Sequence, residues 1–372
     1  MGNNRILNTL DDAKRLSAEY NIPLTDIILI GLNIEGAYDS SIVSDRMRFN
    51  MVPDNSGGNE FYFALTNTKD SRWKINGGEL SFNGERIGKV GNTEEDTCDN
   101  TYWRRFISLG GKNCGTELTI NSNSRSFCSG CEFCGTYNLS PEDQDEKDLS
   151  NPDKLRRKLD NILLENDIVD LSNLHEIGVV TGCFPNENLT LQHLNMLHDV
   201  LRGDYDFSGE LKYVGSQIQS REALENLVSH GPTGISQTVE CFERRDILLQ
   251  PKKQLSLDFA REILDNAKDL GINTTLLYIM GLDKLSTFEN EMKLFVPYLT
   301  KMPVINTLQE YVEGQSDLRV PEARSMEYYL KARKIMEEIC EPLGFKPNVW
   351  ENYRGLWFTE YSKEGLENVI RI

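Results

Sequence analysis

The sequence lacks any apolar run long enough to cross a membrane. None of its 372 residues belongs to an apolar stretch of roughly 18 residues, the length that marks a membrane helix. Residues 1–8 also lack the apolar core of a secretory signal. We therefore expect a cytoplasmic protein with no membrane partner.

Cysteine and histidine are scarce, with eight and four residues respectively. Eight cysteines are too few for a disulfide scaffold in a chain of this length. His193 and His198 are five positions apart on an expected helix, which does not place them on one face for metal binding. The glycine-rich dinucleotide motif, the phosphate loop and the nucleophile elbow are all absent from the sequence. No motif in the sequence therefore supports a dinucleotide-binding site, a phosphate-loop site or a hydrolase site of the nucleophile-elbow type.

Basic residues are outnumbered, 40 against 58 acidic ones, and the net charge is −18. Nucleic acid is therefore not expected as a partner, because phosphate binding needs a basic surface. Four basic residues nevertheless gather near the cysteine-rich segment: Arg104, Arg105, Lys112 and Arg125. They are either scattered solvated charges or a docking patch for an acidic electron-transfer protein.

Three cysteines do crowd one short segment, at Cys128, Cys131 and Cys134. In a reducing compartment such crowding indicates a metal site rather than disulfides. A 4Fe–4S cluster takes four ligands, so three thiolates would leave one iron open. Structural zinc also takes four ligands, and Cys98 or Cys114 could complete such a site. The triplet by itself favours an iron–sulfur site with an open position.

The first 110 residues read as a β-rich region. A short helix is expected at residues 10–20, followed by alternating segments at 47–52, 60–65 and 79–82. Asparagine- and glycine-rich turns separate these segments, which is typical of a β-meander. No catalytic motif is present in this region.

From about residue 115 the pattern becomes strand, loop and helix, repeated six times. The expected strands are 117–121, 177–181, 211–215, 235–240, 273–280 and 304–308. Expected helix starts are Asn151, Thr190, Ser220 and Ser256. Consecutive βα units predict a parallel sheet with right-handed crossovers, either doubly wound or a barrel lacking two of eight units. In both topologies function lies beyond the carboxyl ends of the strands.

A first strand, a three-cysteine loop and five further βα units together resemble the radical S-adenosylmethionine superfamily. The usual spacing there is Cys-x3-Cys-x2-Cys with an aromatic residue before the last cysteine, and Phe133 fills that position. The first spacing here is two residues, so the motif is a variant. The resemblance implies an α/β fold: a partial (β/α)6 TIM-like barrel at residues 111–320, an N-terminal β-rich accessory region at 1–110, and a C-terminal helical extension at 321–372.

The resemblance also implies a chemistry. Cys128, Cys131 and Cys134 would hold a 4Fe–4S cluster whose open iron binds S-adenosylmethionine. Reductive cleavage of that cofactor would give a 5′-deoxyadenosyl radical, which abstracts hydrogen from a small-molecule substrate. A flavodoxin- or ferredoxin-type protein would supply the electron. The alternatives are a peptide or carrier-bound substrate, or a non-catalytic iron–sulfur or zinc protein on an α/β scaffold.

Cofactor contacts follow from the same resemblance. The cofactor-binding positions would be Phe133, Thr181, Gly182, Glu240, Arg244, Arg245, Ile279 and Gly281. Carbonyl groups at Thr181 and Gly182 would accept from the ammonium group. Glu240 would bind the ribose hydroxyls, and Arg244 or Arg245 the carboxylate. From the residues alone, two other interpretations stay open. Thr181 and Gly182 could be tightly packed strand-end residues, and the residues Glu240, Arg244 and Arg245 could form a cluster of charges on a surface loop.

Cys183 follows the second strand, where a thiol could return a hydrogen atom to a substrate radical. The alternative is a small buried residue. The segment after the sixth strand, with a helix expected at 321–339, is similar to the biotin-synthase-like branch. That similarity implies that Gln309, Glu310 and Tyr311 contact the substrate.

Overall fold

The structure is a computed structural model. It describes residues 6–95, 103–108, 115–120, 130–135, 137, 151–165, 168–172, 174–180, 182–250, 252–347, 355–359 and 369–370. Cys98, Cys114, Cys128 and Thr181 lie outside these ranges, as do Lys112, Arg125 and the side chains of Arg104 and Arg105. Within the described part of the chain, no helix is long and apolar enough to span a membrane.

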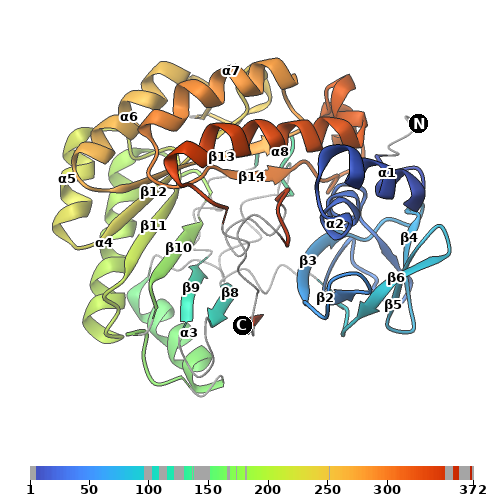
Figure 1. The fold of residues 1–372 in the computed structure, drawn as a ribbon. Helices are drawn as coiled ribbons and strands as arrows, with labels where there is room; N and C mark the ends of the chain where they lie inside the picture. Colours follow the sequence, from blue (N-terminus) through green and yellow to red (C-terminus); the bar gives the residue numbers. More distant parts are fainter. Residues whose placement is uncertain are drawn as a thin grey trace.

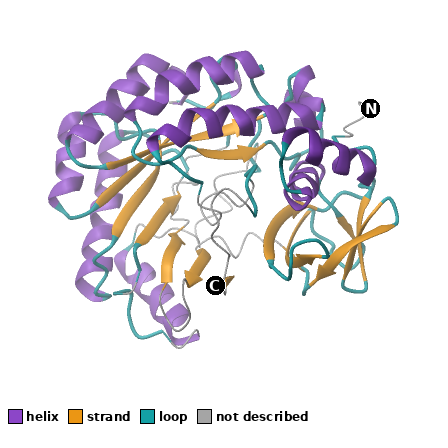
Figure 2. Ribbon diagram, viewed as in Figure 1, coloured by secondary structure: helices purple, strands orange, loops and turns teal. Residues whose placement is uncertain are grey.

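Six parallel strands form the centre of the fold and pair in the order of the sequence. They are β9 (Gly115–Ile120), β10 (Glu176–Val180), β11 (Glu210–Gly215), β12 (Thr233–Glu240), β13 (Asn273–Met280) and β14 (Val304–Thr307). Because the order never reverses, the sheet is the curled half-barrel type and not a doubly wound sheet. Figure 1 shows the strands as an arc, and Figure 2 shows helices along its outer side. The expected partial barrel is confirmed.

Five helices connect these strands and cover the outer face of the sheet. They are α3 (Pro152–Glu165), α4 (Glu187–Asp204), α5 (Arg221–Ser229), α6 (Leu257–Asp269) and α7 (Leu285–Phe295). Ile235 packs in one apolar cluster with α4 and α5, and Val239 in another with α6. Since strand side chains alternate, Ser236 and Thr238 face the opposite, concave side of the sheet.

Helix caps explain where several of these helices begin. Asn151, Ser220 and Ser256 each accept a backbone N–H at the expected position. The expected start at Thr190 is wrong, because Asn186 caps α4 by accepting the N–H of Leu189 at 3.0 Å. Thr190 then lies inside the helix, where its hydroxyl donates to the carbonyl of Asn186.

A buried ion network lies at the amino-terminal end of the parallel strands. The carboxylate of Glu176 accepts from Lys212 at 3.1 Å and from Lys301 at 2.9 Å. Lys301 also pairs with Glu210 at 3.0 Å. Although burial opposes it, the two ammonium groups lower the pKa of Glu176 to about 2.

A second sheet contains the N-terminal strands, in the order β1-β4-β5-β6-β2-β3 with β7 beside β2. They are β1 (Tyr38–Asp39), β2 (Arg46–Pro53), β3 (Phe61–Thr66), β4 (Trp73–Asn76), β5 (Glu79–Phe82), β6 (Glu85–Val90) and β7 (Glu94–Glu95). The three strands expected here are present as β2, β3 and β5. The expected helix is α1 (Leu10–Tyr20), and a second helix, α2 (Leu24–Glu35), follows it.

Two further strands extend the parallel sheet at its β9 edge. β8 (Trp103–Ser108) pairs with β9 antiparallel, and β15 (Val369–Ile370) pairs with β8. The sequence pattern predicts neither strand. The six-stranded parallel sheet therefore gains an antiparallel margin formed by β8, which precedes β9 in the chain, and by the much later β15.

The N-terminal part shares one apolar core with β13, β14 and helix α8 (Met326–Cys340). The helix expected at 321–339 begins as a short 3-10 turn, η8 (Pro321–Arg324), and becomes α-helical after Ser325. Arg333 of α8 pairs with the buried carboxylate of Asp26 in α2 at 2.5 Å. These contacts attach the N-terminal sheet to the barrel at the side of its sixth strand. The other 3-10 turns are η4 (Arg245–Ile247), η5 (Lys252–Gln254), η6 (Val296–Tyr298), η7 (Gln315–Leu318) and η9 (Glu341–Leu343).

Candidate functional site

The cysteine loop lies against the segment that follows β12. The backbone N–H of Glu132 donates to the carbonyl of Ile247 at 3.1 Å. The N–H of Leu249 donates to the sulfur of Cys131 at 3.3 Å. Cys131 is 6% exposed, so its sulfur is turned into the protein and already has one backbone donor.

Gln315 holds the same loop from the β14 side. Its buried side-chain amide donates to the carbonyls of Glu132 at 2.7 Å and Cys134 at 3.0 Å. Its amide oxygen accepts the N–H groups of Tyr311 at 2.8 Å and Val312 at 3.0 Å. One side chain therefore fixes the cysteine loop and the segment after β14 relative to each other.

An apolar bed lies between these two attachments. Its buried members are Cys131, Phe133, Cys241, Ile247, Leu248, Leu282 and Leu308, and Ile279 packs against them. Phe133 and Ile279, both expected at the cofactor site, therefore lie in one cluster. Gly281 follows β13 with φ +116°, and an added Cβ would lie 3.5 Å from Leu308. A glycine is suited to this backbone conformation.

Lys252 is the cation of the site. Its ammonium pairs with Glu240 at 2.5 Å, and both side chains are largely buried. Burial raises the pKa of the Cys131 thiol to about 12, and the ammonium of Lys252 acts in the opposite direction. Although burial opposes it, the carboxylate of Glu240 and the sulfur of Cys131 hold the pKa of Lys252 well above its usual range. Lys252 thus remains charged beside the cysteine loop.

Glu240 has the only left-handed non-glycine backbone among the described strand residues of the half-barrel, with φ +68°. A register shift between Thr238 and Glu240 accompanies it. Such conformations cost about 1–3 kcal/mol and concentrate at functional sites. Glu240 Oε1 binds Lys252, while Oε2 is buried and has no hydrogen-bond partner in the described part of the chain.

The segment after β12 is held rigidly. Asp283 accepts the N–H groups of Phe242 at 2.6 Å and Glu243 at 2.9 Å. Arg245 donates to four backbone carbonyls, those of Val239, Cys241, Lys252 and Leu255. The guanidinium of Arg245 is therefore engaged in folding this segment, whereas the guanidinium of Arg244 donates to the carbonyl of Leu318 at 2.6 Å.

Polar atoms without partners line the concave face of the sheet. The hydroxyls of Ser236 and Thr238 are buried and make no hydrogen bond within the described residues. The same holds for Oδ1 of Asn306, which is level with Ile279 in the neighbouring strand. Buried polar groups normally have partners. These atoms therefore fit a polar ligand held inside the half-barrel.

The other expected residues occupy the same edge of the sheet. Gly182 and Cys183 lie within three residues of the end of β10 at Val180, and Cys183 is buried. Gln309 is 2% exposed, and its amide has no hydrogen-bond partner among the described residues. The carboxylate of Glu310 accepts the N–H of Gly314 at 2.9 Å, which gives Glu310 a local structural contact.

Only two of the three clustered cysteines can be placed, because Cys128 lies outside the described residues. No group of three or more potential metal ligands occurs within the part of the chain that the structure describes. Cys131 and Cys134 lie on one turn, with the N–H of Cys134 donating to the carbonyl of Cys131 at 2.9 Å. Both cysteines therefore lie in the segment that is hydrogen-bonded to Leu249 and Gln315.

Sequence reasoning missed Lys252, Gln315 and Arg46. Arg46 comes from β2 and lies with its guanidinium 4.7 Å from the ring centre of Tyr311. Gln315 and Arg46 reach the site through contacts with residues distant in sequence, so no local pattern predicts their roles. The only available signal is for Lys252, a basic residue in the segment that directly follows a strand.

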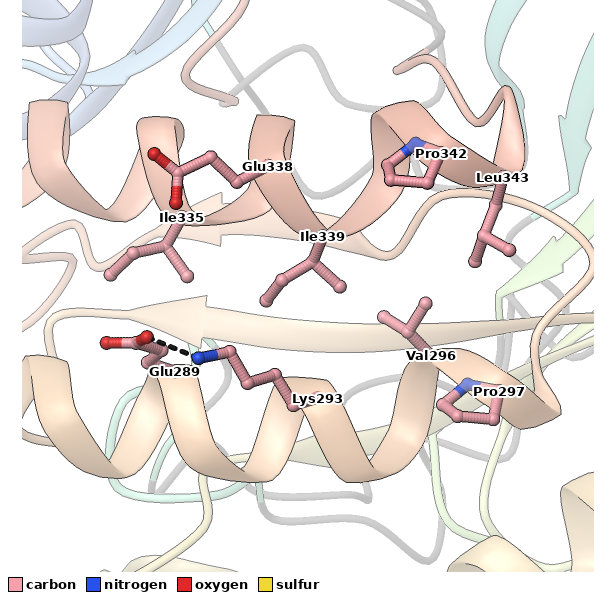
Figure 3. A pocket seen from close by; sticks show the side chains of 9 residues that line it. All are labelled: Glu289, Lys293, Val296, Pro297, Ile335, Glu338, Ile339, Pro342 and Leu343. Atoms are coloured by element: carbon pink, nitrogen blue, oxygen red, sulfur yellow. Dashed lines mark hydrogen bonds and ion pairs between the residues drawn. The ribbon is translucent and has the colours of Figure 1, made fainter.

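A surface groove lies elsewhere, between α7 and α8 (Figure 3). Its lining residues are Glu289, Lys293, Val296, Pro297, Ile335, Glu338, Ile339, Pro342 and Leu343. Glu289 and Lys293 pair with each other at 2.5 Å along α7. Since helices and not strand ends form this groove, it is separate from the cysteine loop.

Comparison with known proteins gives distant structural likenesses. No protein-family model and no curated protein matches this sequence. Among solved structures, SuiB of Streptococcus suis bound to S-adenosylmethionine is 11% identical, with a TM-score of 0.41, over 61% of this chain and 48% of SuiB. The hydrogenase maturase HydG of Carboxydothermus hydrogenoformans is 13% identical, with a TM-score of 0.39, over 60% of this chain and 52% of HydG.

A third likeness is to the radical S-adenosylmethionine methyltransferase TsrM of Kitasatospora setae, solved with cobalamin and an iron–sulfur cluster. It is 12% identical, with a TM-score of 0.34, over 52% of this chain and 36% of TsrM. The chain thus spans about a third to a half of the length of these proteins. At such scores the likenesses carry no argument about function.

Proposed function

We propose that this protein is a radical S-adenosylmethionine enzyme. The observation that supports it most is the position of the cysteine loop. Cys131 and Cys134 are held at the carboxyl edge of a six-stranded parallel half-barrel, above a concave face with unpartnered polar atoms. Ligands of parallel α/β folds bind at this edge.

Cys128, Cys131 and Cys134 would hold a 4Fe–4S cluster through three thiolates, leaving one iron for the cofactor. When bound and reduced, such a cluster would supply the one electron for reductive cleavage of the bond between the sulfonium sulfur and the 5′ carbon of S-adenosylmethionine, which would give methionine and a 5′-deoxyadenosyl radical able to abstract hydrogen from a substrate. The chain itself supplies orientation and a dry environment. The buried apolar bed around Phe133 serves the second purpose.

The cofactor's polar groups have candidate partners on the chain. Oε2 of Glu240 is buried and can accept from a ribose hydroxyl. Because Arg245 is committed to four backbone carbonyls, the carboxylate is assigned to Arg244 or Lys252. Gly182 and Thr181 are proposed for the ammonium group, and Ile279 and Gly281 for the adenine.

The substrate is proposed to be a small molecule bound on the concave face, with Gln309, Glu310 and Tyr311 beside it. Asn306 contributes a buried oxygen on the same face as the apolar bed. Cys183 is proposed as a hydrogen donor to the substrate radical. A flavodoxin- or ferredoxin-type protein is proposed as the electron donor.

Cysteine variants test the cluster directly. Anaerobically reconstituted Cys131→Ala should lose its iron and sulfide, because one of three ligands is removed. Cys340→Ala is the matched control, since Cys340 is buried in α8 and packs in the core shared with the N-terminal part. If Cys340→Ala lost the iron while Cys131→Ala kept it, the ligand assignment would be wrong.

A further inference from the structure

The segment after β12 brings two electropositive groups to the sulfur of Cys131. The backbone N–H of Leu249 donates to this sulfur at 3.3 Å. Burial raises the pKa of the Cys131 thiol, the ammonium of Lys252 lowers it, and the carboxylate of Glu240 raises it to a smaller extent. The ammonium of Lys252 is therefore the stronger of the two charges that act on the sulfur.

Hydrogen bonds fix the backbone that carries Lys252. Its carbonyl accepts from the guanidinium of Arg245 at 2.6 Å. The N–H of Lys253 donates to the carbonyl of Leu249 at 3.1 Å, which closes one turn between the two groups that act on the cysteine sulfur. The side chain of Lys252 is 14% exposed and is held by its ion pair with Glu240 at 2.5 Å. The ammonium is therefore a fixed and largely buried charge.

A buried charge beside a redox centre changes the reduction potential of that centre. Reduction of a 4Fe–4S cluster adds one electron without making or breaking a bond, so the cluster becomes more negative. A nearby cation stabilises the more negative state, and a hydrogen bond to a ligating sulfur acts in the same direction. Because Cys131 is 6% exposed, water screens these interactions less than it does at the surface. The net charge of −18 on the chain opposes the added electron, which makes a local cation more important.

From this geometry we infer that Lys252 raises the reduction potential of the cluster held by Cys128, Cys131 and Cys134, and that Glu240 partly offsets this effect. Lys252 acts through the ligand Cys131 and is therefore a positioning residue. The inference rests on the proposed function, because it takes the three cysteines to hold the cluster. It adds a control of electron entry that the cysteine motif does not specify, and it holds whether or not the ammonium also binds the cofactor.

A redox titration of the cluster tests the inference. It is followed by electron paramagnetic resonance on the anaerobically reconstituted full chain, without S-adenosylmethionine, because Glu240 and Lys252 are also proposed for the cofactor site. Lys252→Met should make one-electron reduction at least tenfold less favourable, a shift of about 59 mV toward more negative potential. Lys252→Arg should keep the potential close to that of the wild type. Glu240→Gln should shift the potential in the positive direction, because it leaves the ammonium without its counter-ion.

Lys253→Met is the matched control, because Lys253 is the next residue, is exposed and carries the same charge. Its potential should stay close to that of the wild type, since water and salt screen an exposed charge. Opposite shifts in Lys252→Met and Glu240→Gln indicate an electrostatic effect, because a disturbed loop would move both potentials the same way. The inference is overturned if those two shifts have the same sign, if Lys252→Met leaves the potential unchanged, or if Lys253→Met shifts it equally.

Iron and sulfide content separate this inference from the proposed function. Both should be the same in Lys252→Met as in the wild type. Loss of iron from Lys252→Met would make Lys252 a structural residue of the loop and would overturn the inference. If the wild type itself held no reducible cluster, the proposed function would fail and the inference with it. An intact cluster whose potential does not shift in Lys252→Met overturns the inference alone.

Discussion

Replacing Gln315 tests whether its hydrogen bonds hold the cysteine loop in place. Gln315→Leu removes two donors from the carbonyls of Glu132 and Cys134, and one acceptor shared by two N–H groups. Each hydrogen bond contributes about 1 kcal/mol net, and buried groups left without partners cost more. Since water can satisfy some of the loop groups that lose Gln315, we expect the free energy of local opening of the cysteine loop to fall by about 3 kcal/mol.

That energy corresponds to an open population on the order of 100-fold larger. Hydrogen exchange at residues 130–135 should speed up by a similar factor, and a chelator should remove iron from the reconstituted protein faster. Gln315→Glu should behave similarly or worse, since a carboxylate cannot donate to the two carbonyls. Gln192→Leu, at an exposed position of α4, provides the control. Exchange and iron loss within threefold of the wild type would refute the proposed grip.

Three further predictions concern charge and chemistry. The folded-state pKa of Glu176, lowered to about 2, contributes about 3 kcal/mol of stability that is present above pH 4.5 and lost as the pH falls toward 2. Urea unfolding at pH 6 and pH 3 should therefore show a smaller loss for Glu176→Gln than for the wild type, and equal losses would contradict the ion network. Lys252→Met should leave the iron content intact but weaken S-adenosylmethionine binding roughly tenfold, one charge-assisted hydrogen bond; unchanged affinity in calorimetry would remove Lys252 from the cofactor site. Cys183→Ala should preserve cofactor cleavage and change the substrate-derived product seen by mass spectrometry, whereas an identical product would indicate a packing role.

The barrel could be predicted because its determinants are local. Alternating apolar strands such as β13, and caps such as Ser256, show their structure within a few residues. Helix α2 escaped prediction because ten of its twelve residues are buried, so its sequence lacks the polar face that gives helical periodicity. The helix start predicted at Thr190 is wrong because another residue of a typical capping type, Asn186, lies one turn earlier and caps α4.

The site was predictable only in part, for the same physical reason. The cysteine triplet is a local motif, and its place after the first strand of the barrel follows from the order of elements. Gln315 contacts Glu132 across 183 positions of sequence, and Arg46 meets Tyr311 only when the N-terminal sheet packs on the barrel. The sequence makes Arg245 a candidate to bind a carboxylate, but in the structure its guanidinium donates to four backbone carbonyls.

The most direct measurement is the release of 5′-deoxyadenosine from S-adenosylmethionine by the anaerobically reconstituted protein, with and without dithionite. A chain carrying about four irons should release it only when reduced, and Cys131→Ala should release none. One zinc per chain, with no 5′-deoxyadenosine under either condition, would contradict the central claim that the cysteine loop is an iron–sulfur site with one iron open to the cofactor.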